Sequence, residues 1–335
     1  MEKRTLGRTG LKVSVIGLGG IPIQRVAGEE ATAILKTALE KGINFFDTAR
    51  AYTDSEVKFG VGFRGTKRPI IATKSMARDK ETMARDIELS LKNLGVGTID
   101  LYQLHNVKDR ETLQKVLGPD GALAALKEAR ARGEINYIGI TGHIPEILVE
   151  ALKTGEFDTV QFPYNPVERE AEKALIPLAL EMNIGMIAMK PLAGGAFKNA
   201  ALAIKFLLNS PVSTIIPGVD KLDQVAENAA LGQQILPLTE EEQETLNREV
   251  RQLGERFCRR CEYCQPCPQG IDIPMIFLLE GYWTRYGLQD WAVDRYRPLA
   301  KKASDCVECG LCEEKCPYNL PIREMLKESR SHLEG

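Results

Sequence analysis

Four ionisable side chains follow short apolar runs in the N-terminal third of the sequence. They are Asp47, Tyr52, Lys74 and His105. A tyrosine hydroxyl has an unperturbed pKa of about 10, so it donates a proton poorly at neutral pH unless a nearby cation lowers that pKa. Lys74 is the candidate cation, and Asp47 would keep it charged. With a neutral His105 hydrogen-bonding a carbonyl oxygen beside Tyr52, this set suits the delivery of hydride to a carbonyl carbon.

Eight cysteines form the second chemical signal. They are Cys258, Cys261, Cys264, Cys267, Cys306, Cys309, Cys312 and Cys316. The later run has the spacing CxxCxxCxxxCP, and the earlier run has one residue fewer before its last cysteine. Three thiolates at steps of three, followed by Cys-Pro, are typical ligands of [4Fe-4S] clusters. The spacing therefore predicts two such clusters.

Two other uses of these cysteines stay open. Structural zinc also takes CxxC pairs, but usually as separated pairs rather than three cysteines at steps of three. Disulfides are disfavoured because a cytoplasmic chain keeps its thiols reduced. Iron and acid-labile sulfide analysis distinguishes clusters from zinc.

Short β-rich apolar runs alternate with amphipathic stretches before the first cysteine, and these elements must position the polar residues. The predicted strands are Val13–Leu18, Ile43–Phe46, Ile70–Thr73, Ile99–Leu104, Ile135–Thr141, Thr159–Phe162, Gly185–Met189 and Thr214–Pro217. The predicted crossover helices include Glu29–Lys41, Thr82–Leu94, Ala122–Arg132 and Ala200–Leu208. Eight such units match a closed (β/α)8 barrel, whose chemistry lies at the C-terminal ends of its strands. An open doubly wound sheet is the alternative, but Gly17–Pro22 does not fit its GxGxxG loop.

The flanking segments complete the predicted organisation. Thr5–Val13 indicates a hairpin that turns at its glycines, and Thr239 is the predicted N-cap of a helix that ends near Leu253. We expect a barrel over 1–237, a connecting helix over 238–256 and a small, mainly α-helical iron-sulfur domain over 257–335.

Composition excludes several classes of partner. The 335 residues carry 44 basic and 46 acidic side chains, a formal net charge of −2, which does not indicate nucleic-acid binding. No apolar run approaches the roughly 20 residues of a membrane helix, and the first residues lack the apolar core of a secretion signal. We therefore expect a cytoplasmic protein with neither a nucleic-acid nor a membrane partner.

Several strings in the predicted barrel match one enzyme family. They are Leu6–Ser14, Phe46–Ala49 with Tyr52 and Ser55-Glu56, Thr73-Lys74, and Asp100–His105. On these strings the chain resembles the aldo-keto reductases over about residues 1–235. The resemblance implies that Tyr52 donates the proton, that Lys74 and Asp47 tune it, and that His105 orients the carbonyl. It also implies NADPH or NADH as cofactor without a Rossmann fold.

The same resemblance implies a set of cofactor contacts. They are Thr141, Gln161, Met189, Lys190, Leu192, Pro217, Gly218, Gln224, Glu227 and Asn228. Gln161 matches the glutamine that binds the nicotinamide carboxamide, whereas Thr141 and the nearby His143 stand where the family has a Ser-Asn pair. Met189 and Lys190 replace the usual aromatic residue and serine. A helix-start role for His143 stays as the alternative.

The eighth βα loop bears on the choice of dinucleotide. The family's Lys-Ser pair is missing there, and Gln224 stands where the family has an arginine. Because a 2′-phosphate prefers a guanidinium or an ammonium group, Lys221 is the only nearby substitute. We expect dual or NADH-leaning use.

The cysteine region resembles bacterial ferredoxins, and more closely the α-helical ferredoxin domains of respiratory enzymes. In such pairs of runs the fourth cysteine ligates the other cluster. One predicted set is Cys258, Cys261, Cys264 and Cys316. The other is Cys306, Cys309, Cys312 and Cys267.

Two functions from different classes follow. The first is an NAD(P)H-dependent reductase of an aldehyde or ketone, or the reverse, with an iron-sulfur domain that transfers electrons or docks a redox-protein partner. The alternative is an electron-transfer or redox-sensing protein whose barrel binds the nicotinamide cofactor with little carbonyl turnover. A binding protein with structural clusters is a third hypothesis. Hydride transfer moves two electrons at once and needs no iron, so the barrel's chemistry does not explain the clusters.

Overall fold

The chain forms two compact units. The computed structural model describes residues 1–254, 256–260, 262–316 and 318–335. The first unit comprises Met1–Pro191 and Ala201–Leu238, and the second comprises Leu192–Ala200 and Thr239–Gly335. The chain therefore passes from one unit to the other three times. The domain limits at 237 and 256 stay predictions.

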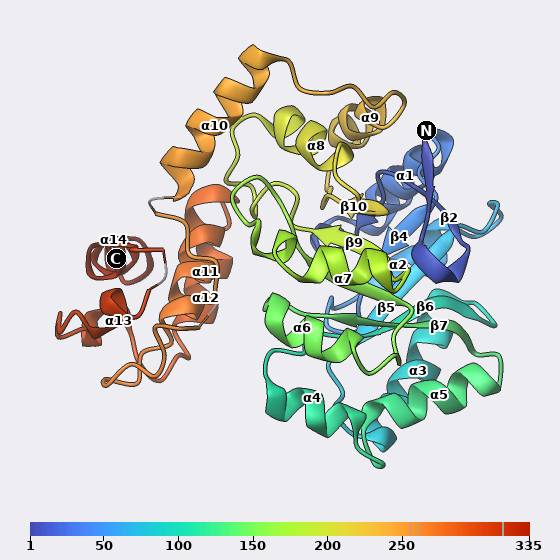
Figure 1. The fold of residues 1–335 in the computed structure, drawn as a ribbon, viewed down its shortest axis with the longest axis horizontal. Coiled ribbons are helices and arrows are strands. Elements are labelled where there is room, and N and C mark those ends of the chain that lie inside the picture. The colour runs from blue at the N-terminus through green and yellow to red at the C-terminus, as the bar shows by residue number, and fades with distance from the viewer. Residues whose placement is uncertain (255, 261, 317) are drawn as a thin grey trace. The chain divides into compact units, whose positions relative to one another are not determined.

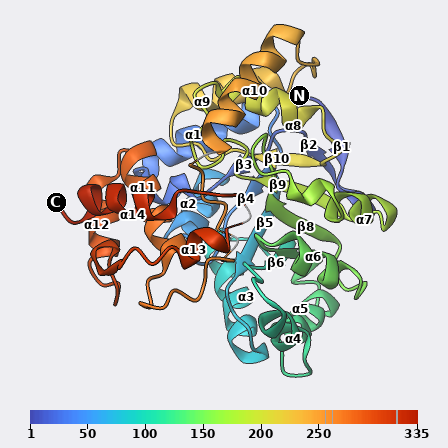
Figure 2. The same cartoon turned by 60° about the vertical axis from the view of Figure 1, so that its left-hand side comes forward.

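Parallel strands form the central sheet of the first unit, in the order β10-β9-β8-β7-β6-β5-β4-β3. They are β3 (Leu18–Gly19), β4 (Phe45–Asp47), β5 (Ile70–Ser75), β6 (Ile99–Leu104), β7 (Ile135–Thr141), β8 (Thr159–Pro163), β9 (Gly185–Met189) and β10 (Thr214–Ile216). Parallel bridges Ile16–Ile215 and Gly19–Gly218 join the two edges. Figure 2 shows the strands surrounded by helices. The predicted (β/α)8 barrel is confirmed, and the open doubly wound sheet is wrong.

The helices of the first unit cover the outside of the barrel (Figure 1). They are α1 (Gly28–Glu40), α2 (Ser55–Gly62), α3 (Lys80–Leu94), α4 (Arg110–Leu117), α5 (Ala122–Ala131), α6 (Pro145–Leu152), α7 (Leu175–Glu181), α8 (Ala200–Leu208) and α9 (Leu222–Leu231). Helix α3 shows how local sequence sets them, because the Asp79 side chain caps it by accepting from the Thr82 amide and Gly95 ends it at a φ of 64°. Its buried face consists of Met83, Ile87, Ser90 and Leu94, the spacing of one helical stripe.

The N-terminal hairpin differs from the expected first strand. Strands β1 (Lys3–Thr5) and β2 (Lys12–Ser14) pair antiparallel, which confirms the predicted hairpin. The predicted strand Val13–Leu18 is wrong as one element, since its first residues belong to β2 and its last to β3. The chain turns between them, where the Ser14 hydroxyl donates to the Ile16 carbonyl at 2.7 Å. Leu6 and Val13 pack with interior residues of the barrel strands and so close its N-terminal end.

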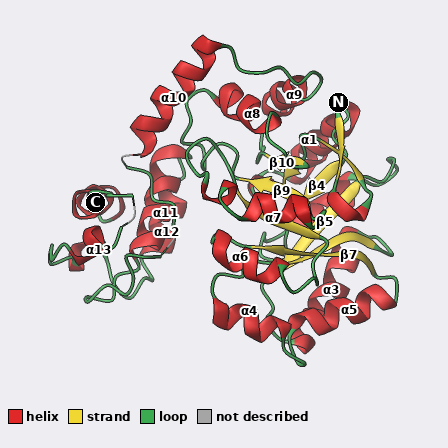
Figure 3. Cartoon of the chain, viewed as in Figure 1, coloured by secondary structure: helices red, strands yellow, loops and turns green. Residues whose placement is uncertain are grey.

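The described part of the second unit consists of helices and loops (Figure 3). The helices are α10 (Glu240–Gly254), α11 (Ile273–Arg285), α12 (Gln289–Tyr296), α13 (Leu311–Glu314) and α14 (Ile322–Leu333). The predicted helix after Thr239 and the predicted helical connection between the cysteine runs are confirmed. Five half-buried cysteines pack against the apolar core of this unit. In the described residues, no helix is both long and apolar enough to cross a membrane.

The loop after β9 also belongs to the second unit. It covers Leu192–Ala200. Gly194 and Gly195 have φ values of 66° and 73°, and a Cβ built on Gly194 would lie 3.4 Å from the Tyr286 hydroxyl. The Asn199 amide donates to the Glu249 carboxylate at 3.4 Å. Glycine suits this segment because it adopts positive φ without strain and lets the chain approach the tyrosine ring.

Candidate active site and cysteine sites

A buried ion pair lies at the C-terminal end of the barrel. Asp47 ends β4 and Lys74 lies near the end of β5, and their side chains are 3% and 1% exposed. The Lys74 Nζ donates to Asp47 Oδ2 at 2.5 Å and to the Thr48 carbonyl at 2.9 Å. Burial lowers the pKa of Lys74, and the Asp47 carboxylate opposes that shift. The charge on Lys74 therefore depends on Asp47.

Tyr52 and His105 lie beside this pair. Tyr52 is in the segment between β4 and α2, and Lys74 Nζ is 5.2 Å from the centroid of its ring. His105 directly follows β6, and its ring meets that of Tyr52 edge to face with centroids 5.9 Å apart. Burial, followed by the positive charges of Lys74 and Arg78, lowers the pKa of His105 to about 3. The imidazole is thus neutral at pH 7 and can hydrogen-bond a carbonyl oxygen.

Two glutamines extend the polar interior from Asp47. Gln103 Nε2 donates to Asp47 Oδ1 at 3.3 Å and to Gln161 Oε1 at 3.0 Å. Among the described residues, Gln103 Oε1 and His105 Nδ1 are buried without a hydrogen-bond partner. Gln103 was not predicted as a site residue from the sequence. Its position two residues before His105 on an apolar strand was the available signal, because residues two apart in a strand face the same side.

A second polar row runs across the ends of β6, β7 and β9. Lys190 Nζ lies 2.8 Å from His143 Nε2, and His143 Nδ1 lies 3.0 Å from Asn106 Oδ1. Because an ammonium group only donates, the proton of His143 is on Nδ1. The Thr141 hydroxyl oxygen accepts from the Asn106 amide at 2.8 Å, so its own proton can still be donated. His143 therefore lies just before the start of α6 and also hydrogen-bonds within this polar row.

The other expected cofactor positions are more dispersed. Met189 ends β9, and its sulfur accepts from Gln161 Nε2 at 3.7 Å, whereas Leu192 falls in the second unit. Pro217 and Gly218 follow β10 directly. On α9, Asn228 is buried and Glu227 is exposed.

The loop between β10 and α9 holds an unexpected cation. The Gln224 side chain accepts from the Asp220 amide at 2.9 Å. Arg25, from the segment after β3, brings a guanidinium nitrogen within 3.7 Å of the Asp220 carboxylate. Lys221 is thus not the only cation near this loop. Arg25 was not predicted there because it is far from the loop in sequence.

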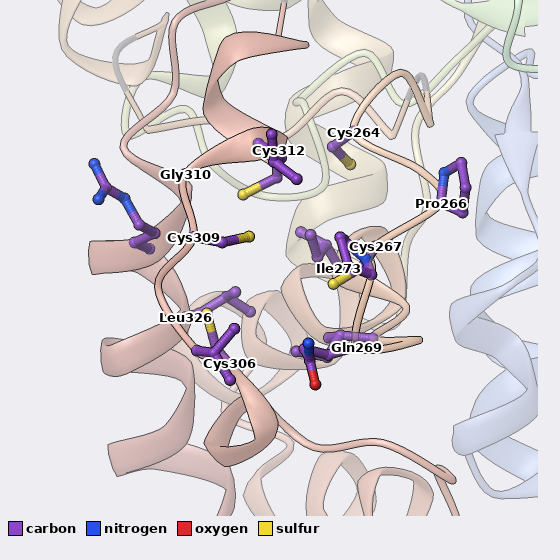
Figure 4. Close-up of a pocket in the computed structure, with 15 residues that line it drawn as sticks. Cys264, Pro266, Cys267, Gln269, Ile273, Cys306, Cys309, Gly310, Cys312 and Leu326 are labelled. Atoms are coloured by element: carbon purple, nitrogen blue, oxygen red, sulfur yellow. The ribbon is translucent and has the colours of Figure 1, made fainter.

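Five cysteines line one pocket of the second unit. Figure 4 shows Cys306, Cys309 and Cys312 on one side of a space and Cys264 and Cys267 on the other. The rest of the lining is largely apolar and includes Ile271, Ile273 and Leu326. This donor set fits an iron-sulfur cluster, because thiolates are its ligands and an apolar surround limits water.

A second pocket draws on both cysteine runs. Cys258, Cys264 and Cys316 line it together with Phe277 and Tyr318. Cys264 and Ile273 line both pockets, so the two adjoin. Cys316 thus shares a pocket with the distant Cys258, as crossed ligation requires. Cys261, predicted as the fourth ligand here, lies outside the described residues.

Several of the described cysteines are free thiols, namely Cys267, Cys306, Cys309, Cys312 and Cys316. Within the described ranges, no three His, Cys, Asp or Glu side chains are placed to hold a single metal ion.

The comparison with protein families agrees with both units. The model described as "Aldo/keto reductase family" matches residues 15–200, and the one described as "4Fe-4S dicluster domain" matches residues 257–321. Since the first match spans more than half of the chain, this chain belongs to the aldo-keto reductase family. Its C-terminal part carries a 4Fe-4S dicluster domain.

Individual relatives support this assignment. An L-galactose dehydrogenase from Arabidopsis thaliana is 27% identical over 282 residues, which are 69% of this chain and 88% of the relative. The holo form of aldo-keto reductase AKR11C1 from Bacillus halodurans superposes with a TM-score of 0.64 at 26% identity, covering 74% of this chain and 96% of that one. An aldo-keto reductase from Klebsiella pneumoniae, solved with NADPH, gives a TM-score of 0.63 at 25% identity, with coverages of 74% and 95%.

Proposed function

We propose that this chain reduces an aldehyde or ketone to the alcohol, or catalyses the reverse reaction, with NADPH or NADH. The observation that supports the proposal is the grouping of Asp47, Lys74, Tyr52 and His105 at the C-terminal ends of adjacent barrel strands. In (β/α)8 barrels this end carries the chemistry. When bound, the nicotinamide supplies the hydride that adds to the carbonyl carbon.

The chain's own residues handle the proton. The Tyr52 hydroxyl transfers its proton to the carbonyl oxygen as negative charge develops there. The Lys74 ammonium stabilises the phenolate that remains, and Asp47 keeps Lys74 charged in spite of its burial. Neutral His105 hydrogen-bonds the same carbonyl oxygen and orients it for attack.

The cofactor contacts support the same assignment. The amide of Gln161, the hydroxyl of Thr141 and the orphaned Oε1 of Gln103 offer polar groups for a carboxamide. At the eighth βα loop, the Asp220 carboxylate forms an ion pair with Arg25. The negative charge of Asp220 would repel a 2′-phosphate bound at this loop. We infer dual or NADH-leaning use of the dinucleotides.

The second unit adds one-electron chemistry. Iron-sulfur clusters transfer single electrons, and we propose that the two cysteine-lined pockets hold one [4Fe-4S] cluster each. A redox-protein partner in the cytoplasm would then exchange electrons with this domain.

The proposal is tested by removing the Tyr52 hydroxyl. In anaerobically purified protein, Tyr52→Phe should lower carbonyl reduction by at least about a hundredfold while NADH binding persists. Tyr137→Phe is the matched control, because the Tyr137 hydroxyl donates to the Thr9 carbonyl in the N-terminal hairpin region. If wild type reduces no carbonyl in a broad panel, yet NADH bleaches cluster absorbance, the electron-transfer alternative replaces this function.

A further inference from the structure

A fully buried carboxylate lies behind the Tyr52 segment. Glu56, near the start of α2, is 1% exposed. Its oxygens accept hydrogen bonds from Arg50 Nη1 at 2.7 Å, Thr73 Oγ1 at 2.8 Å, Ser90 Oγ at 2.8 Å and Asn93 Nδ2 at 3.1 Å. A buried carboxylate persists only when it is paired and hydrogen-bonded, and here the segment before α2, β5 and α3 all contribute partners.

Arg50 connects this carboxylate to the Tyr52 segment. Its amide donates to the Lys74 carbonyl at 2.9 Å. Its guanidinium reaches Glu56 on one side and lies 3.6 Å from the Asp86 carboxylate on the other. Asp86 in turn accepts from the Ser75 hydroxyl. The residue two positions before Tyr52 is therefore held by its backbone and by its side chain.

The conformation of the segment between β4 and α2 also requires stabilising contacts. Thr48, at its start, donates from its amide to the Ala72 carbonyl at 2.8 Å, so β5 binds the segment at both Ala72 and Lys74. Thr53, directly after Tyr52, has a φ of 38°, which is strained for a β-branched residue. Such a conformation persists only where surrounding contacts impose it. The contacts of Arg50 meet that requirement.

We propose that Arg50 and Glu56 are positioning residues that hold the Tyr52 phenol within reach of the Lys74 charge. This inference rests on the proposed function, in which Tyr52 donates the proton. The groups facing Tyr52 include Lys74 from β5 and His105 after β6, with Asp47 behind Lys74. If the segment loosens, Tyr52 moves away from the ammonium group and ionises less readily. A purely structural role for the Arg50–Glu56 pair would change stability but not this ionisation.

The test follows the ionisation of Tyr52 directly. The holoprotein is labelled with 13C at tyrosine Cζ, and the Tyr52 signal is identified by its loss in Tyr52→Phe. In Arg50→Met we expect the pH midpoint of Tyr52 to rise by about one unit, because the loosened segment carries the phenol away from the Lys74 ammonium group. Arg50→Lys, which keeps the charge, should recover part of the shift. An Arg50→Met midpoint equal to that of wild type overturns the inference.

Arg68→Met is the matched control. Arg68 forms an ion pair with Asp100 at 3.0 Å near the start of β5, away from the Tyr52 segment, so its loss should leave the Tyr52 midpoint unchanged. An equal shift in this variant would also overturn the inference. If Arg50→Met does not fold, Glu56→Gln removes the charged partner of Arg50 with little change of shape, and by loosening the Tyr52 segment it should shift the midpoint in the same direction.

The titration needs no turnover, so it separates two failures. Absence of carbonyl reduction in wild type would end the proposed function, whatever the midpoints show. With reduction present, Arg50→Met should lower kcat by about tenfold while KM for the dinucleotide stays nearly constant, because only transition-state stabilisation is lost. A change in KM alone would contradict the positioning role.

Discussion

Crossed ligation of the two clusters gives the sharpest prediction, because it opposes what sequence proximity indicates. Cys316 is close in sequence to Cys312, yet it shares a pocket with Cys258, whereas Cys306, Cys309 and Cys312 share the other pocket with Cys267. If each pocket holds one cluster, each double variant loses either one cluster or both. Only the choice of the two cysteines decides the outcome.

Two double variants distinguish the alternatives. Each [4Fe-4S] cluster carries four irons, so wild type should hold about eight irons and eight sulfides per chain. Cys258→Ala with Cys316→Ala removes two ligands of one cluster and should leave about four irons. Cys312→Ala with Cys316→Ala removes a ligand from each cluster and should leave few. Both are measured as iron and acid-labile sulfide per chain after anaerobic purification.

Ligation within each sequence run would give the opposite result. If ligation followed the sequence runs, the Cys258 and Cys316 pair would lose both clusters, whereas Cys312→Ala with Cys316→Ala would retain about four irons. Finding zinc but no acid-labile sulfide in wild type would show that the protein binds no iron-sulfur cluster. EPR of the dithionite-reduced protein checks that the remaining irons form a [4Fe-4S] cluster.

Three further predictions concern the barrel. The ratio of kcat/KM for NADPH to that for NADH should stay below about a hundredfold, since Asp220 disfavours a 2′-phosphate, and a larger preference would contradict this account of the loop. Asp47→Asn should lower the free energy of unfolding by about 3 kcal/mol in denaturant titrations, because it leaves Lys74 buried without its partner. As a control, Glu150→Gln breaks an exposed ion pair with Arg110 and should change the free energy of unfolding little. The pKa of His105 is about 3 in the folded chain against 6.5 for the free group. Between these pH values only the unfolded chain binds a proton at this residue, so the free energy of unfolding should fall as pH drops from 6.5 towards 3. His105→Gln should show a shallower fall, and an unchanged slope would contradict the burial of that imidazole.

Much of the barrel was predictable because parallel strands buried on both faces are continuous apolar runs. The limits of Ile99–Leu104, Ile135–Thr141 and Gly185–Met189 agree with β6, β7 and β9. The run Val13–Leu18 failed because two short strands with a turn between them have the same apolar character as one strand. Periodicity alone does not reveal such a turn.

The candidate site divides in the same way. Asp47, Lys74 and His105 were identifiable because each stands at or next to a strand end, where barrel chemistry is expected. The Gln103 bridge and the Arg50–Glu56 pair depend on partners far away in sequence, including Gln161 on β8 and Ser90 on α3. Which buried polar groups meet is decided by tertiary packing. No local pattern encodes it.

The loop Leu192–Ala200 also affects how this protein can be divided. A gene cut after residue 238 would leave this nine-residue insert on the barrel fragment, separated from Tyr286 and Glu249, with which it packs. The fragment that carries the cysteines would lose the same contacts. Transplanting the second unit onto another enzyme would therefore require moving two pieces of chain, one of them taken from between β9 and α8.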